Sequence, residues 1–226
     1  MKRSCLILAL ASALLLGFPA ISMAWDTYFD GSQLPTQEGW TFGGTDTSQC
    51  STDGDALRIL DNGSNADAYF LKVISSYGQP ITSQARVRVA GASDLGSVFL
   101  HATNGKVGTL LSFFPGELRI SFGWGPDTWL SFPADFSSFH TVRVAIDSQD
   151  SSFVWLDGEL LAEGVAHSSQ GAMIFGAYSV PGTSDSYWDY VAASPEFLPI
   201  PEPSSLLALG GGVMGLAGLA VRRRRR

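Results

Sequence analysis

The sequence predicts an all-β domain made of two packed antiparallel sheets. Three observations support this fold class. Short runs rich in Val, Ile, Phe, Tyr and Trp alternate with polar residues at the two-residue period of a strand. Helical stripes at three- and four-residue spacing are missing, and clusters of Gly, Asp, Asn, Ser and Pro separate the runs. A dozen such runs favour two sheets packed face to face over one open layer.

The expected strands follow one another closely along the chain. They are 56–60, 68–74, 84–90, 97–102, 109–114, 117–124, 129–132, 140–147, 153–156, 159–162, 172–178 and 187–192. Alternation also predicts their buried sides: Val142 and Val144 oppose Arg143, and Val87 opposes Arg86. Turn residues at 61–63, 104–105, 115–116 and 157–158 separate neighbouring runs, and Asn-Gly and Asp-Gly pairs favour two-residue antiparallel hairpins.

The first 24 residues differ from this pattern. Lys2 and Arg3 precede an apolar run at 6–18, and Ser22-Met23-Ala24 places small residues on both sides of a cleavage position. We therefore predict a secretory signal peptide over 1–24, removed by signal peptidase to leave Trp25 first. A retained N-terminal anchor is the alternative, but the apolar run is short for a bilayer span.

The C-terminal end also departs from the strand pattern. Four prolines within 195–203 predict an extended linker over 195–205, because proline cannot continue a sheet or a helix. Residues 206–221 carry no charge and predict one transmembrane helix, and the arginine block 222–226 should stay in the cytoplasm. The β-sandwich domain is thus expected over 25–194, as a single domain.

Charge and cysteine content restrict the function of this domain. Seven of the 14 Lys and Arg residues lie in the two ends, so the body keeps seven against all 21 acids, a net charge of −14. Such a balance excludes nucleic acid as an expected partner, and it is compatible with plain solubility or with calcium binding. Cys50 is the only cysteine after the signal peptide, so no intramolecular disulfide is expected.

The tail has a recognisable order of parts. Pro201-Glu202-Pro203, a Gly-rich apolar span and a terminal arginine block follow one another, and together they resemble the PEP-CTERM sorting signal over about 26 residues. The resemblance implies that Pro201, Glu202 and Pro203 are recognised by exosortase, a membrane transpeptidase or protease of bacteria that make exopolysaccharide and biofilm. The protein would then be exported to the cell envelope or beyond it, with transient or permanent anchoring. The alternative is an ordinary single-span anchor.

That tail is sometimes named an ice-binding protein C-terminal region. The body lacks the repeated flat Thr-x-Thr array that such a function would need, and only Thr45-Asp46-Thr47 has this spacing. We therefore do not expect ice binding.

Two parts of the body resemble a known fold family. The segments 139–144, which contains His140-Thr141, and 153–160, which contains Asp157-Gly158, are similar to neighbouring late strands of concanavalin A-like (laminin-G-like) jelly rolls. The segments 28–31 and 187–191 also resemble the paired first and last strands of that fold. The resemblance implies a two-sheet antiparallel jelly-roll sandwich, and it supports fold more than function.

Catalytic residues are hard to find in this pattern. Glycosidases need two carboxylates about 5 to 10 Å apart, and Asp157 and Glu159, which have alternate spacing, fall in a predicted turn. The histidines His101, His140 and His167 are too dispersed for a zinc site, and no Gly-x-Ser-x-Gly elbow is present. We therefore predict a protein that is not an enzyme.

Binding residues are easier to nominate. All six tryptophans lie in the body, and exposed aromatic rings stack on sugars. Alternation places Trp124 in the core with Ile120 and predicts that Trp129 and Trp155 face a ligand. The alternative is that both sheets bury aromatic rings beneath loops.

A structural calcium ion is a further alternative, although no cofactor is certain from the sequence. Asp30 and Asp189 would meet if the terminal strands pair, and Asp46, Asp53 and Asp55 crowd one loop. Neither set has EF-hand spacing, and isolated loop acids are usually just solvated.

Together these features predict an exported, surface-sorted, lectin-like protein that binds carbohydrate or exopolysaccharide, or forms part of the extracellular matrix, without catalysis. A structural or adhesive biofilm protein without sugar specificity and a glycoside-active enzyme are the alternatives. Polysaccharide, the processing enzyme, signal peptidase and the membrane are the expected partners.

Overall fold

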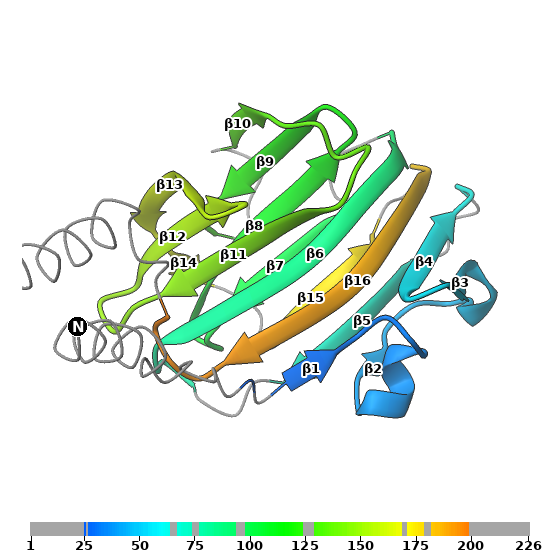
Figure 1. Cartoon of the computed structure of the whole chain (residues 1–226). Coiled ribbons are helices and arrows are strands. Elements are labelled where there is room, and N and C mark those ends of the chain that lie inside the picture. Colours follow the sequence, from blue (N-terminus) through cyan, green and yellow to red (C-terminus); the bar gives the residue numbers. More distant parts are fainter. Residues whose placement is uncertain are drawn as a thin grey trace, which may run out of the picture.

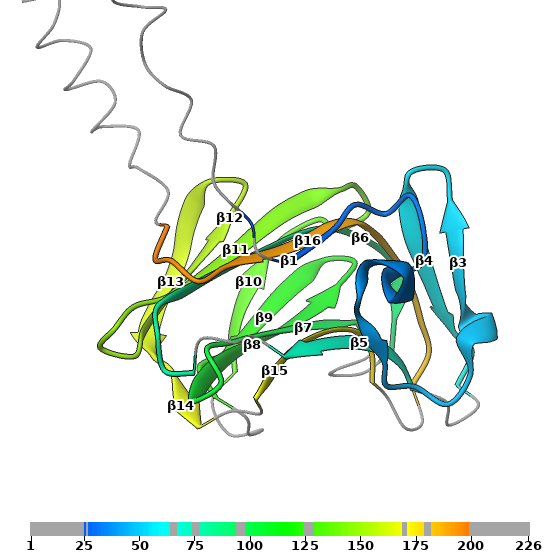
Figure 2. The ribbon, with the colours of Figure 1, turned by 90° about the horizontal axis from the view of Figure 1, so that it is seen from below.

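The computed structural model describes residues 25, 27–63, 67–73, 77–93, 98–123, 129–168, 171–178 and 182–198. Over these residues the chain forms two eight-stranded antiparallel sheets that lie face to face (Figures 1 and 2). The only helical elements in the described ranges are two 3-10 turns, η1 (Pro35–Glu38) and η2 (Thr47–Gln49). The predicted all-β sandwich of two antiparallel sheets is confirmed.

The first sheet, sheet A, contains the longest strands. Its order is β13-β12-β11-β6-β16-β4-β3, and β1 also pairs with β16. The bounds are β1 Thr27–Phe29, β3 Cys50–Asp53, β4 Ala56–Asp61, β6 Ile81–Ala92, β11 His140–Ile146, β12 Ser151–Leu156, β13 Glu159–Val165 and β16 Ser184–Ser194.

The second sheet, sheet B, has the order β10-β9-β8-β7-β15-β5-β2, and β14 also pairs with β8. The bounds are β2 Thr41–Phe42, β5 Ala68–Val73, β7 Phe99–Thr103, β8 Val107–Phe114, β9 Glu117–Ser121, β10 Leu130–Pro133, β14 His167–Ser168 and β15 Ala172–Ala177. Figure 2 shows this sheet as the lower of the two layers.

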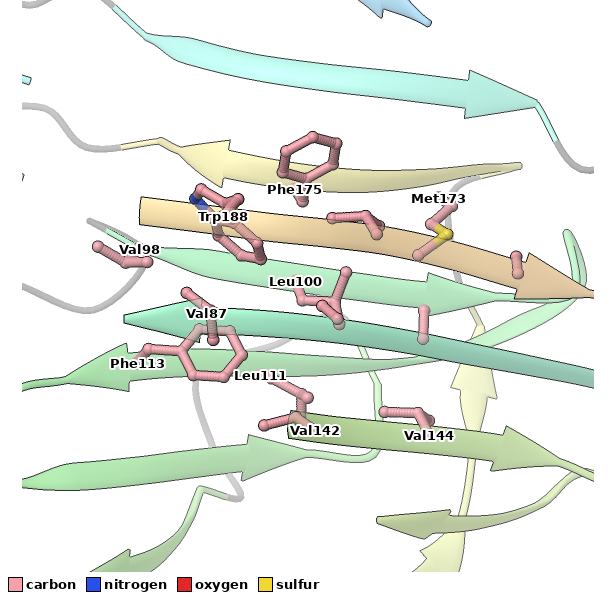
Figure 3. Packing of buried hydrophobic residues seen from close by; sticks show 14 of the residues in the cluster. Val87, Val98, Leu100, Leu111, Phe113, Val142, Val144, Met173, Phe175 and Trp188 are labelled. Carbon is pink, nitrogen blue, oxygen red and sulfur yellow. The ribbon is translucent and has the colours of Figure 1, made fainter. Parts of the chain in front are cut away.

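The core fills the space between the inward faces of the two sheets. Phe175 of β15 lies at its centre, with ring centroids 5.0 Å from both Trp40 and Trp188 and 5.6 Å from Phe70. Figure 3 shows Trp188 of sheet A among side chains of both sheets. One polar contact also joins the layers, because the buried hydroxyls of Thr109 and Ser152 lie 2.6 Å apart.

All twelve predicted strand segments contain a strand. Alternation missed β2, β3 and β14 as strands and left β1 to the fold resemblance, because these strands have only two to four residues. The predicted buried sides are confirmed: Val87, Val142 and Val144 are inaccessible, whereas Arg86 and Arg143 are partly exposed.

The turns follow the sequence signals with one exception. Asp157 and Gly158 both have positive φ, 49° and 89°, as a tight hairpin between β12 and β13 requires. Residues 61–63 do not form a hairpin, since β4 and β5 belong to different sheets. Gly63, two residues after the end of β4, has a positive φ of 77°.

The terminal strands meet as the fold resemblance implied. Phe29 of β1 pairs with Val191 of β16. The register of β16 shifts between Trp188 and Tyr190, and this bulge places Asp189 and Tyr190 together on the outward side of sheet A.

Cys50 is a free thiol at the start of the edge strand β3. Desolvation by burial, with a smaller contribution from Asp46, raises its pKa to about 12. The thiol is therefore protonated at neutral pH and poorly reactive.

The predicted signal peptide at 1–24 and the predicted transmembrane segment at 206–221 lie outside the described residues, as does Trp124. Among the described residues, no helix has the length and apolar character that a membrane crossing requires.

Candidate functional site

The outward face of sheet B brings aromatic and polar side chains into one row. Strand register aligns Tyr69 of β5, Gly176 of β15, Phe99 of β7, Ser112 of β8 and Arg119 of β9. The row crosses the sheet from β5 to β9, perpendicular to its strands. We call this surface face B.

Three rings form the aromatic end of face B. The centroid of Tyr178 lies 5.9 Å from Tyr69 and 6.3 Å from Phe99, and Tyr69 lies 6.5 Å from Phe99. Strand β15 lies between β5 and β7. Its Gly176 has φ 135°, and a Cβ there would come within 2.7 Å of the Tyr69 Cα. Tyr178 is 53% exposed and closes the cluster towards solvent.

Charged groups form the opposite end of face B. Arg119 donates two hydrogen bonds, of 3.0 and 3.1 Å, to the carboxylate of Glu117, and its guanidinium lies 4.6 Å from the centroid of the Phe114 ring. Hydrogen bonds from Arg119 and Ser131 lower the pKa of Glu117. This end thus carries a fixed pair of opposite charges beside an aromatic ring.

Between these ends the floor of face B is polar and buried. His101, Ser112 and Ser121 face outward from the core but are almost inaccessible to solvent. Desolvation lowers the pKa of His101 to about 4, so the imidazole is neutral at physiological pH.

The outward face of sheet A, here face A, has a different character. Register aligns Arg88 with Tyr187 and Tyr187 with Arg58 across β6, β16 and β4. The Arg88 guanidinium lies 3.9 Å from the Tyr187 centroid and 5.5 Å from that of Phe139, and Arg58 lies 5.5 Å from Tyr187. The result is an alternating row of arginines and aromatic rings.

Two of these arginines have carboxylate partners. Arg58 makes a two-pronged pair with Asp185, with both hydrogen bonds 2.9 Å long, and Arg86 pairs with Asp189. Arg88 has no carboxylate partner among the described residues. Four of the seven cationic side chains of the acidic body, including Arg143, therefore lie on face A.

The two tryptophans predicted to face a ligand lie on different sheets. Trp129 immediately precedes β10 of sheet B and is partly exposed, but its indole nitrogen is buried and has no hydrogen-bond partner among the described residues. Trp155 lies on face A, as alternation predicted, but its side chain is only 6% exposed. Phe153 stacks on it with a centroid distance of 5.9 Å.

The acids predicted to hold calcium come near each other only through the backbone. Gly31, which follows Asp30, lies close to the backbone carbonyl of Asp189. The Asp30 carboxylate accepts hydrogen bonds from Ser32, which lower its pKa, and that of Asp189 is held by Arg86. In the described part of the chain no three His, Cys, Asp or Glu side chains gather as metal ligands.

The second set of acids considered for calcium, Asp46, Asp53 and Asp55, belongs to a helix cap, a strand and a turn. The Asp46 carboxylate caps η2 by accepting from the Ser48 backbone nitrogen at 2.8 Å. Asp53 belongs to β3 and Asp55 to the turn that follows it, and both are exposed. The arrangement gives these acids the role of turn and cap residues.

A Ser–His–Asp sequence of contacts lies at the start of β11. His140 Nδ1 is 2.6 Å from Asp157 Oδ2, its Nε2 is 3.2 Å from Ser138 Oγ, and Asp157 Oδ1 accepts from the Thr141 backbone nitrogen. In a serine hydrolase the carboxylate is buried, whereas the Asp157 side chain is 52% exposed. We interpret this contact as a clip between β11 and the β12–β13 hairpin.

Comparison with known proteins identifies the tail. Residues 199–226 match the PEP-CTERM protein-sorting motif, which marks a protein that is exported and sorted at the cell envelope. The motif residues Pro201, Glu202 and Pro203 lie outside the described residues. No curated protein has a significantly similar sequence.

Solved structures resemble the body in fold. A carbohydrate esterase from Shiga toxin-encoding bacteriophage phi24B superposes with a TM-score of 0.57 at 9% identity, over 76% of this chain and 98% of that one. A glycosyl hydrolase family protein from Mycobacterium fortuitum gives a TM-score of 0.53 at 16% identity, over 76% and 100%. At these identities the likeness establishes the sandwich fold alone.

The sequence reasoning did not nominate Tyr69, Phe99 and Tyr178. Their separation along the chain hides their contact, which only the pairing of β5, β15 and β7 creates. Alternation in β7 was a usable signal, since Phe99 and His101 oppose Leu100 and Ala102.

Proposed function

We propose that this protein is an exported, surface-sorted β-sandwich that binds carbohydrate through face B without catalysis. Its body is a jelly roll of the concanavalin A-like type, and Trp129 and Tyr178 contact the sugar. Trp155 contributes only if the segment that covers it moves away. The sorting motif supports the location at the cell surface, where polysaccharide is abundant.

The observation that carries the proposal is the composition of face B. Sugar rings stack on aromatic faces, and their hydroxyls need donors and acceptors fixed in place. Face B supplies the exposed Tyr178 at one end and the Arg119–Glu117 pair at the other. Trp129, which is partly exposed and immediately precedes β10, adds a further aromatic ring on sheet B.

A glycan screen tests this proposal. The full chain, kept in detergent micelles, is applied to a glycan array and to exopolysaccharide of the host bacterium. Binding should fall about tenfold in Tyr178→Ala, as expected for the loss of one stacking contact with its hydrogen bond. Tyr77→Ala is the matched control, because Tyr77 is 72% exposed and takes no part in face B.

The other outcomes separate the alternative functions. A silent screen together with loss of biofilm cohesion after gene deletion would indicate a structural or adhesive protein. Release of reducing sugar or acid from a polysaccharide panel would indicate an enzyme, and either outcome contradicts the proposal.

The sorting step has its own test. Intact-mass analysis of membrane and medium fractions compares the wild type with a variant in which Pro201, Glu202 and Pro203 are replaced by alanine. Loss of the tail from the wild type alone supports processing by exosortase, whereas intact tails in both proteins would indicate an ordinary anchor.

A further inference from the structure

The beginning of the predicted linker packs against the folded body. Residues 195–198, here called the strap, follow β16 directly and cross part of face A. Sequence composition predicted an extended linker over 195–205, and it does not show the contacts that residues 195–198 make with the body.

A single hydroxyl group fixes the strap on both sides of Phe197. Thr82 Oγ1 donates to the Glu196 carbonyl at 2.7 Å and accepts from the Leu198 backbone nitrogen at 2.8 Å. Thr82 shares its outward direction on β6 with Gln84 and Arg86, yet its side chain is 0% exposed. An outward-facing threonine is buried here because the strap lies over it.

Two further contacts hold the strap. Arg143 Nη1 donates to the Leu198 carbonyl at 3.2 Å. The Phe197 ring packs edge-on against Phe153 with a centroid distance of 5.6 Å, and Phe153 in turn stacks on Trp155. The aromatic surface that includes Trp155 is thus covered by the protein's own chain.

Docking of the strap brings the sorting motif close to the body. Leu198 is fixed, and only residues 199 and 200 separate it from Pro201, so the motif begins within about 10 Å of the docked backbone. A processing enzyme needs an extended backbone around the bond that it cleaves, but Thr82 and Arg143 already occupy backbone groups of Glu196 and Leu198.

We propose that the strap restrains the sorting tail, so that a membrane-bound processing enzyme cleaves the tail only after the strap detaches from face A. This inference rests on the proposed processing of the tail. Detachment frees residues 195–198 and lengthens the accessible chain on the body side of the motif. Processing is then slower than for an unrestrained tail, in proportion to the small detached fraction.

The test uses Thr82→Val in the full chain, which removes both hydrogen bonds but nearly preserves the shape of the side chain. Hydrogen exchange of the Leu198 amide and cleavage at 195–200 by an unspecific protease should both become about tenfold faster. Tail loss in an exosortase-containing host should accelerate to a similar extent. Thr82→Ser keeps the hydroxyl and should behave like the wild type.

Thr109→Val is the matched control. It removes a buried threonine hydroxyl that contacts Ser152 between the two sheets, on the side of sheet A opposite to the strap. If Thr109→Val accelerated strap cleavage as much as Thr82→Val, general loss of stability would explain the effect and the proposal would be wrong.

The outcomes distinguish this inference from the sorting proposal. Faster exchange and protease cleavage in Thr82→Val, with no tail loss from either protein in the host, would support the docked strap and reject the sorting step. Equal host processing of both proteins despite faster exchange would reject the restraint and leave sorting intact. Rapid exchange of the Leu198 amide in the wild type would show that the strap is not docked.

Discussion

The two outward faces of the sandwich treat polar groups in opposite ways. Face A holds its charges near solvent, where Arg58 and Arg86 pair with acids and Arg88 lies between aromatic rings. Face B instead buries neutral polar groups, among them His101 and Ser112. Electrostatics on face A is therefore screened by water and salt, whereas each polar group in the buried floor of face B depends on protein partners.

This difference in exposure indicates which face is suited to bind a ligand. An open row of paired charges gains little from a further partner, since its groups are already solvated or neutralised. On face B the exposed ring of Tyr178 can gain new contacts without much rearrangement, whereas the polar floor beside it is inaccessible. Face A instead contacts the protein's own strap through Thr82 and Arg143.

Faces A and B lie on the two sides of one shared core, and a change in this core should have the largest effect on stability. Phe175 contacts Trp40, Phe70 and Trp188 and joins both sheets. Phe175→Ala should lower the free energy of unfolding by about 4 kcal/mol, through lost burial and a residual cavity. Urea unfolding would measure this change, with Leu130→Ala, at a position 45% exposed, as the control.

Both faces should unfold in the same transition. If exchange of the backbone amides in β11 of sheet A and in β8 of sheet B separated along the urea axis, the two sheets would be independent units. The contrast between the faces would then not belong to a single cooperative domain.

The second prediction concerns the buried histidine of face B. Burial lowers the pKa of His101 from 6.5 to about 4, so the unfolded chain binds a proton at a higher pH than the folded protein does. The free energy of unfolding is therefore unaffected by this histidine above about pH 6.5 and decreases as the pH falls towards 4, where only the unfolded chain is fully protonated. The loss should reach about 3 kcal/mol, and His101→Gln should reduce the pH dependence by that amount.

Urea unfolding at several pH values between 7 and 4 measures this effect, with the exposed His167→Gln as a comparison. Carboxylates also titrate towards the acid end, so the difference between each variant and the wild type is the relevant quantity. An unchanged slope in His101→Gln would mean that the floor of face B is hydrated.

Much of this architecture could be predicted from the sequence because strand alternation is a local property. Val142, Arg143 and Val144 reveal their directions without knowledge of their neighbours. The Asp157-Gly158 turn is equally local, since positive φ at both positions favours these residue types. The very short strands had too few residues to show a period.

The candidate site was less predictable because it depends on strand order. Tyr69 and Phe99 become neighbours only when β15 lies between their strands, with Gly176 at the crossing point. Alternation correctly turned Trp155 outward, but no local pattern shows that Phe153 and the strap would cover it. The docking of residues 195–198 was missed because proline content indicates only an extended backbone. It does not show that the hydroxyl of Thr82 on β6 bonds to that backbone.

The smallest expected change in stability comes from an ion pair on face A. Asp185 pairs with Arg58, and their side chains are 24% and 35% exposed. Asp185→Asn should lower the free energy of unfolding by about 1 kcal/mol or less, because solvent screens the pair. Raising the salt concentration to about 1 M, where the Debye length is near 3 Å, should shrink that difference further.

Urea unfolding at low and high salt measures this change, with the exposed Glu163→Gln as the matched removal of one negative charge. A loss above about 2 kcal/mol that persisted in salt would mean that the Arg58–Asp185 pair behaves as a buried ion pair. Face A would then rely on protein partners as face B does, and its open row of charges could no longer be distinguished from the buried polar floor opposite.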